Sequence, residues 1–200
     1  MDPDGTGAPG DHLVSSDSPR QRLDRYRLPS DYRPGASPFR QLSWFCLGAP
    51  LLSARWLPGS LWRSQLLRAF GAEVGAGCRI KPGLRVKYPW RLSVGQHSWL
   101  GEDVWIDNLA HVSIGSQVCL SQGAYLCTGN HDFSASGFDL RCGSIRIGDG
   151  AWVGAMSRLA PGVEIGSDAV VTLGSVVTGS VPPSTIVAGH PAQQIRARWH

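Results

Sequence analysis

Aliphatic residues recur at every sixth position over most of the chain from Val74 onward. The last run needs no restart and comprises Ile147, Val153, Leu159, Ile165, Val171 and Val177. Shorter runs of three begin at Val74, Val94 and Ile114. A period of six fits neither the 3.6-residue period of an α-helix nor the two-residue alternation of a strand. It fits short strands joined by tight turns and wound into a solenoid, so we predict an all-β solenoid fold.

The residues between the aliphatic positions indicate how each coil is filled. In most repeats Ala, Ser, Val or Cys follows the aliphatic residue four positions later, and Gly often follows it directly. Residues four apart lie on the same side of a strand, so the large and the small residue can both point inward. Glycine eases the turn at a corner. Three such faces make a coil, and the five coil starts, at Val74, Val94, Ile114, Ile147 and Ile165, predict a parallel β-helix of about five coils over residues 73–182.

One coil is much longer than the others. The runs that begin at Ile114 and Ile147 are 33 residues apart, whereas the other runs are 18 or 20 residues apart. The extra residues lie between Leu126 and Ile147 and predict a loop over about 128–144 that protrudes from the solenoid. Loops on a rigid scaffold commonly carry function, and His131 lies at the root of this one.

The rest of the chain divides by composition. Residues 1–37 are polar and predict a disordered or extended tail, and residues 183–200 predict a C-terminal tail. Residues 38–72, rich in Trp, Leu and Arg, predict short helices. These helices have two interpretations that can coexist: a cap on the open first coil, or a segment that lies on a membrane surface.

Charge and cysteine usage narrow the class of partner. Residues 20–91 carry 14 of the 19 Lys and Arg residues and only three acids, which favours an anionic partner. Nucleic acid is not expected, because the aromatic residues cluster with Leu and no recognised binding motif is present. The five cysteines are odd in number and form no C-x-x-C pair, which argues against a disulfide framework and a zinc ribbon.

Several segments resemble a known family. They are 105–109, 123–132, 165–171, 174–177, 181–183 and 187–192, which read WIDNL, GAYLCTGNHD, IGSDAVV, GSVV, VPP and VAGHPA. They resemble the hexapeptide-repeat acyltransferases, whose fold is a left-handed β-helix. Galactoside, maltose and nodulation-factor O-acetyltransferases end similarly, and the colanic-acid acetyltransferases are most similar. The resemblance covers roughly residues 42–196 and implies an enzyme that moves acetyl from acetyl-CoA to a hydroxyl of a sugar or an exopolysaccharide precursor.

The resemblance also implies catalytic residues. His131 matches the family's general base, and histidine has a pKa suited to taking the proton of a sugar hydroxyl. The backbone N–H of Ala155 matches the donor that stabilises the tetrahedral intermediate. The alternatives are a loop-capping histidine and an ordinary turn residue. His111 lies at the same offset one coil earlier, but no histidine pair has the spacing that zinc-binding relatives use, so no metal is expected.

Binding residues follow in the same way. Asp107 and Asn108 match a region that contacts the acceptor sugar, although both residue types are also common in turns. Gly154, Ala155, Ala160 and Gly174 match the path of the pantetheine arm of coenzyme A. Arg196 matches an arginine near the nucleotide phosphates, the alternative being a solvated charge.

The resemblance implies a homotrimer with sites between subunits. The acceptor can be a free or a lipid-linked sugar, and we expect a cytoplasmic enzyme, with peripheral contact to the cell membrane as a further expectation. Two rival functions remain open. One is N-acetylation of an amino sugar, and the other is a non-catalytic β-helix scaffold.

Overall fold

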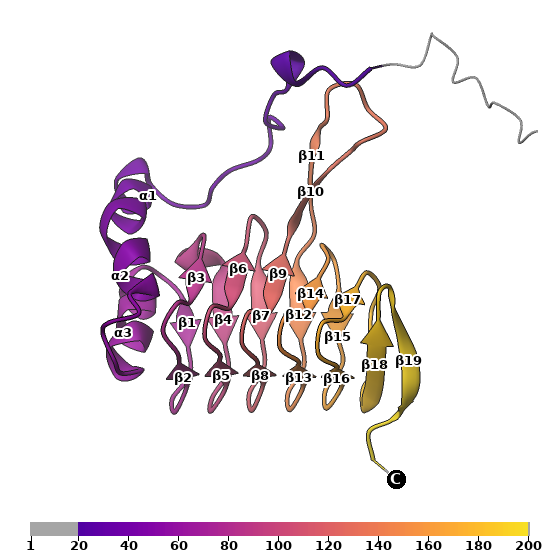
Figure 1. Cartoon of the computed structure of the whole chain (residues 1–200). Helices are drawn as coiled ribbons and strands as arrows, with labels where there is room; N and C mark the ends of the chain where they lie inside the picture. The colour runs from indigo at the N-terminus through magenta and orange to yellow at the C-terminus, as the bar shows by residue number, and fades with distance from the viewer. Residues whose placement is uncertain (1–19, 200) are drawn as a thin grey trace, which may run out of the picture.

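The computed structural model describes residues 20–199 and is a solenoid of five three-stranded coils (Figure 1). Each coil contributes one strand to each of three parallel sheets. The first sheet contains β1 (Glu73–Val74), β4 (Leu92–Val94), β7 (Val112–Ile114), β12 (Ile145–Ile147) and β15 (Glu164–Ile165). The second contains β2 (Arg79–Ile80), β5 (Trp99–Leu100), β8 (Cys119–Leu120), β13 (Trp152–Val153) and β16 (Val170–Val171). The third contains β3 (Arg85–Val86), β6 (Trp105–Asp107), β9 (Tyr125–Cys127), β14 (Arg158–Leu159) and β17 (Val176–Val177).

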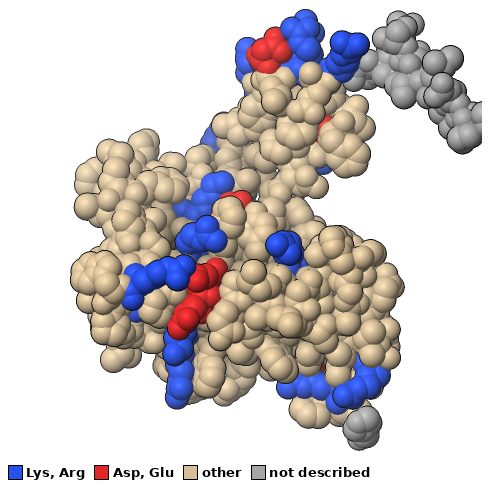
Figure 2. All heavy atoms as spheres, in the orientation of Figure 1, with Lys and Arg blue, Asp and Glu red and all other residues tan. Residues whose placement is uncertain are grey.

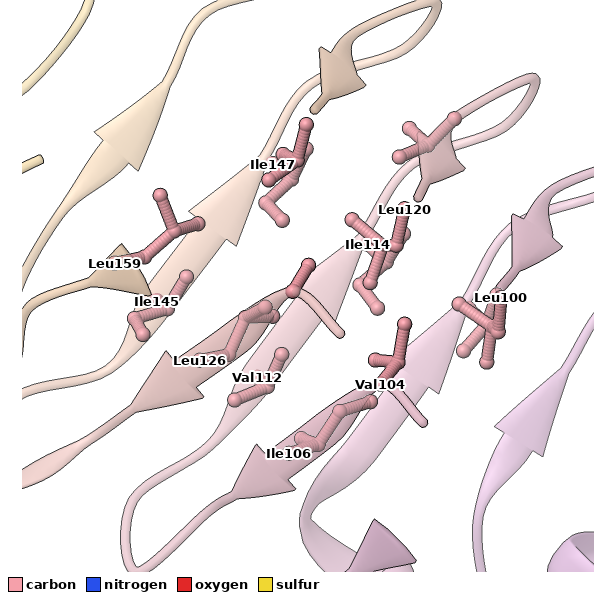
Figure 3. Close-up of a cluster of buried hydrophobic side chains, with 14 of the residues drawn as sticks. Leu100, Val104, Ile106, Val112, Ile114, Leu120, Leu126, Ile145, Ile147 and Leu159 are labelled. Atoms are coloured by element: carbon pink, nitrogen blue, oxygen red, sulfur yellow. The ribbon is translucent and has the colours of Figure 1, made fainter. Parts of the chain in front are cut away.

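The core is the column of aliphatic side chains that the six-residue period predicts. Every position of that period is buried, and residues of successive coils pair in register, as in Val94 with Ile114 and Leu100 with Leu120. Figure 3 shows these side chains pointing into the coil from all three sheets. Stacking the same position of every coil gives a continuous apolar interior, which no single coil could bury alone.

The helical segment covers the open end of the first coil. It comprises α1 (Pro38–Ser43), a π-helical turn η2 (Trp44–Gly48), α2 (Ala49–Ser53) and α3 (Leu61–Ala69). Trp44 Nε1 donates to the carbonyl of Val86, the Ser60 hydroxyl bonds both backbone groups of Ile80, and Arg68 donates to the carbonyl of Val74. The segment therefore satisfies one strand edge of each sheet, edges that would otherwise be open.

A buried arginine that the sequence analysis did not single out stabilises this segment. Arg63 is fully buried and donates to the carbonyls of Leu52, Ala54, Leu57 and Gly59. Burial lowers the pKa of its guanidinium. One guanidinium thus bonds carbonyls at the end of α2 and along the connection to α3, so Arg63 stabilises the shape of that connection.

The last residues differ from the sequence-based prediction of a C-terminal tail over 183–200. Strand β18 (Thr185–Gly189) pairs in parallel with β16, and β19 (Ala192–Ala197) pairs antiparallel with β18. The hairpin extends the second sheet beyond the last coil. Its residues lie outside the six-residue period, so the pattern that reveals the coils did not reveal it.

The protruding segment is a second hairpin, formed by β10 (Gly129–His131) and β11 (Leu140–Cys142). It leaves the solenoid at the corner between the third and first sheets (Figure 1). Residues 20–37, which include the short 3-10 helix η1 (Leu23–Arg25), reach this hairpin, and the Arg22 N–H donates to the carbonyl of Ser136. A further 3-10 turn, η3 (Pro89–Arg91), lies at the same corner two coils nearer the cap. Residues 1–19 of the predicted tail lie outside the described residues.

Candidate active site

His131 is held in one orientation by its own hairpin. Its Nδ1 lies 2.8 Å from the carbonyl oxygen of Phe138, and its ring stacks on the Phe138 ring at 4.2 Å between centroids and 5° between planes. Tyr26 packs edge-on against the imidazole at 5.6 Å. A carbonyl only accepts hydrogen bonds, so the neutral ring carries its proton on Nδ1 and leaves a lone pair on Nε2. Among residues 20–199, Nε2 has no hydrogen-bond partner. In this tautomer, Nε2 of His131 can accept a proton.

The tip of the hairpin is fixed by an ion pair. Asp132 bonds the hydroxyl and the backbone N–H of Ser134 and pairs with Arg141. The bonds from Ser134, more than the charge of Arg141, hold the pKa of Asp132 below its usual range. Since His131 directly precedes Asp132, these contacts also limit the motion of the histidine backbone.

A pocket of about 520 Å³ lies beside the hairpin. Its lining includes Leu140, the register partner of His131, together with Tyr32, Arg33 and Arg91. The Arg91 guanidinium lies 5.4 Å from the Tyr32 ring. The Tyr32 hydroxyl is buried without a partner among residues 20–199, and burial raises its pKa to about 12, so it stays a neutral donor. The pocket therefore offers two guanidinium groups to a polar ligand, whereas the Tyr32 hydroxyl is covered by protein atoms.

Asp107 lies at the same corner in a small polar cluster. It pairs with Lys87 Nζ at 3.1 Å and accepts a hydrogen bond from the Tyr125 hydroxyl at 3.3 Å. Burial, with added contributions from Cys127 and Asp107, raises the pKa of Tyr125, so the phenol remains protonated. Neither Lys87 nor Tyr125 was a sequence candidate. Tyr125 could have been found from the coil register, which places it directly beside Trp105, two residues from Asp107.

Asn108 lies in a different environment from the one that the resemblance implies. It is fully buried, its Oδ1 accepts from the Tyr88 N–H at 2.9 Å, and its Nδ2 donates to the carbonyls of Tyr88 and Arg91 at 2.7 and 3.1 Å. All these bonds run to the turn of the preceding coil. The geometry argues against an acceptor contact for Asn108 and gives it a structural role at the corner that carries the site.

This role can be tested by stability. We expect Asn108→Ala to lower the free energy of unfolding by about 2 to 3 kcal/mol, because it leaves the backbone groups of Tyr88 and Arg91 buried without partners. Chemical denaturation monitored by circular dichroism measures the change. Asp107→Ala is the matched control, and it is expected to cost less because the carboxylate bonds only the Lys87 and Tyr125 side chains and leaves no backbone group without a partner. Equal stability of Asn108→Ala and wild type would contradict the structural assignment.

Ala155 lies at a different corner, between β13 in the second sheet and β14 in the third. It is the first residue of a two-residue turn whose second residue, Met156, has a φ of 60°. The carbonyl of Ala155 accepts from the Gly174 N–H of the next coil, whereas its own N–H has no partner among residues 20–199. The structure thus does not bring Ala155 and His131 to one corner of the chain, since the third sheet lies between them.

The other predicted cofactor residues divide between two regions. Gly154 and Gly174 are at the corner of Ala155, and a Cβ at Gly154 would lie 2.7 Å from the backbone nitrogen of Leu173. Packing between successive coils alone therefore explains why position 154 is a glycine. A Cβ at Gly174 would meet nothing within 4 Å, so its surface is open. Ala160 directly follows β14 and is partly buried, and Arg196 lies exposed in β19 without a carboxylate partner in the described chain.

Two further features bear on the site. Within residues 20–199, no group of three or more His, Cys, Asp or Glu side chains is placed to hold a metal ion. None of the helices in that range is both long and apolar enough to cross a membrane.

Comparison with known proteins decides the family. No known protein-family model matches the chain. It is 37% identical over 180 residues to the "Putative colanic acid biosynthesis acetyltransferase WcaF" of Escherichia coli, covering 89% of this chain and 97% of the relative. The chain belongs to the hexapeptide-repeat acetyltransferases. It is also 29% identical to the galactoside O-acetyltransferase of E. coli, over 67% of this chain and 68% of that enzyme.

A solved hexapeptide-repeat acetyltransferase has the same fold. The Vibrio cholerae protein VCA0836, crystallised in complex with acetyl-CoA, matches with a TM-score of 0.74 and 24% identity, covering 83% of this chain and 92% of that one. The predictions of a hexapeptide-repeat acetyltransferase and of a left-handed parallel β-helix with about five coils, N-terminal helices and a protruding loop are confirmed. The roles of the individual site residues stay predictions.

Proposed function

We propose that this hexapeptide-repeat acetyltransferase moves the acetyl group of acetyl-CoA to a hydroxyl of a sugar or of an exopolysaccharide precursor, with His131 as the general base. The observation that carries the proposal is the free Nε2 of His131, whose ring is fixed by the Phe138 carbonyl. The names of the relatives support the donor and the acceptor class.

The proposed mechanism is direct transfer. The acceptor hydroxyl gives its proton to Nε2 of His131 while its oxygen attacks the thioester carbonyl carbon. The imidazolium that forms is stabilised through the Nδ1–H bond to Phe138. The Ala155 N–H donates to the developing oxyanion. Collapse of the tetrahedral intermediate breaks the carbon–sulfur bond, and the coenzyme A thiolate takes the proton back from Nε2.

We assign the acceptor to the pocket beside Leu140. Arg33 and Arg91 line this pocket and can bond hydroxyl or acidic groups of the acceptor. Asp107 is retained as an acceptor contact, because its side chain is still 17% exposed and lies at the same corner. Asn108 is not part of this proposed set.

The proposed site takes its two groups from two chains. His131 and Ala155 lie at opposite ends of the strands of the third sheet, which supports a site shared between chains. We propose a homotrimer in which the hairpin of one subunit meets the Ala155 corner of its neighbour, with the pantetheine arm beside Gly154, Ala160 and Gly174 and the phosphates toward Arg196. Cytoplasmic location follows from the donor, since acetyl-CoA is a cytoplasmic metabolite.

Product analysis tests the function against its rivals. Incubated with acetyl-CoA and a panel of sugars and amino sugars, the enzyme is expected to release coenzyme A and to add one acetyl group to the acceptor by mass spectrometry. Mild alkali removes an O-acetyl ester and leaves an N-acetyl amide. An alkali-stable product would identify an N-acetyltransferase. Absence of transfer to every acceptor, with acetyl-CoA unbound in a calorimetric titration, would favour the scaffold.

A further inference from the structure

The outer side of the helical segment carries exposed apolar side chains. Phe39, Leu42 and Leu47 on the helix over 38–53 are 80%, 62% and 70% exposed. Trp56 and Leu61, in the connection and at the start of α3, are 79% and 81% exposed. We call these five residues the apolar face of the cap. Scattered apolar residues are normal on a surface, but five of them on one 23-residue segment make this side of the cap a candidate interaction site.

The helix that carries most of this face is apolar on both sides. Its inner side buries Trp44, Gly48 and Leu52 against the first coil, and its outer side presents Phe39, Leu42 and Leu47. A helix that is apolar all round normally has both sides covered. Sixteen residues span only about 24 Å and cannot cross a bilayer, so the outer side suits a helix lying in an interface.

The charge around the apolar face indicates the kind of surface that it contacts. Residues 38–72 contain four Arg and no Lys, Asp or Glu, a net charge of +4. Among these arginines only Arg55 forms an ion pair within residues 20–199, and only Arg63 is buried. Two copies of this face would bring like charges together, whereas an anionic bilayer complements both the arginines and the apolar side chains. In Figure 2 the region over α1 is largely free of charged atoms, and basic side chains lie beside it.

We propose that the apolar face of the cap docks this protein on an anionic phospholipid surface. Phe39, Leu42, Leu47, Trp56 and Leu61 insert at the level of the headgroups, and the exposed Arg40 and Arg55 of the same segment bind lipid phosphates. Tryptophan suits this depth, since one end of its ring system is apolar and the other is polar. The inference is independent of acetyl transfer, because none of the five residues lies in the proposed site.

Vesicle flotation of the full chain tests the proposal. The protein is expected to float with vesicles of equal parts phosphatidylcholine and phosphatidylglycerol and to stay at the bottom with phosphatidylcholine alone. Raising the salt concentration is expected to weaken binding, because the electrostatic part is screened. The triple variant Phe39→Ser, Leu47→Ser, Trp56→Ser is expected to lose at least about tenfold in partitioning, and folding is expected to persist because all three side chains are exposed.

A matched control uses the opposite end of the solenoid. Ile195 and Trp199 are 59% and 60% exposed, and the double variant Ile195→Ser, Trp199→Ser is expected to float like wild type. Acetyl transfer to a soluble acceptor is expected to be unchanged in the triple variant, which separates the lipid result from the proposed function. The proposal is overturned if wild type binds neither vesicle, if the triple variant floats equally well, or if that variant changes the oligomeric mass instead of lipid binding.

Discussion

The variant His131→Ala is expected to lose about 10²- to 10⁴-fold in kcat for acetyl transfer, the range that a positioned general base contributes. The reason is local: Nε2 is the unpartnered ring nitrogen, and the Phe138 carbonyl fixes the tautomer that leaves it unprotonated. The alanine side chain cannot take the proton of the attacking hydroxyl. A steady-state assay of coenzyme A release measures kcat. The KM for acetyl-CoA is expected to change little, since no predicted thioester contact is removed.

His111 supplies the control for this variant. It lies 20 positions before His131 at the same offset in its coil, but its Nε2 is 3.1 Å from the Ser93 hydroxyl and no hairpin surrounds it. His111→Ala is expected to keep wild-type kcat. Retention of activity within tenfold of wild type by His131→Ala, with His111→Ala unaffected, would remove the general base from the mechanism and favour a scaffold.

The coils were predictable from the sequence because each coil buries an aliphatic side chain at the same position. The interruption of this period between Leu126 and Ile147 locates the protruding segment from the sequence alone. The position of His131 at the hairpin root followed from the same count.

What the sequence could not predict depends on contacts that occur once. From the sequence, Asn108 can be a turn residue or a residue that contacts the acceptor. Only the structure shows that its side-chain amide is fully hydrogen-bonded to backbone groups of Tyr88 and Arg91 in the preceding coil. The sequence alone suggests an exposed side chain for Arg63, whereas in the structure the α2–α3 connection covers it and accepts its hydrogen bonds. The contact of Arg22 with Ser136 joins residues 114 positions apart and has no periodic signal.

The corner of Ala155 permits an unusually clean test of the oxyanion donor. In the first coil the equivalent turn position is Pro82, so this corner accepts proline. Ala155→Pro therefore removes the N–H while keeping the turn, and Gly154 has no Cβ to clash with the new ring. We expect kcat to fall about 10²- to 10³-fold, the usual loss for one oxyanion donor. Glu102→Pro, at the same turn position two coils nearer the cap, is the control and is expected to retain activity.

Combining the two inactive variants tests where the site lies. His131→Ala and Ala155→Pro chains are co-expressed with different tags, and mixed oligomers are purified through both. If the hairpin of one chain serves the Ala155 corner of another, some sites in mixed oligomers contain both intact groups. In a trimer, every mixed ring then contains one intact site out of three, which restores about one third of wild-type activity. If both groups served one site within a chain, every site would lack one of them and mixing would restore nothing. Because the third sheet separates the two corners, we expect recovery.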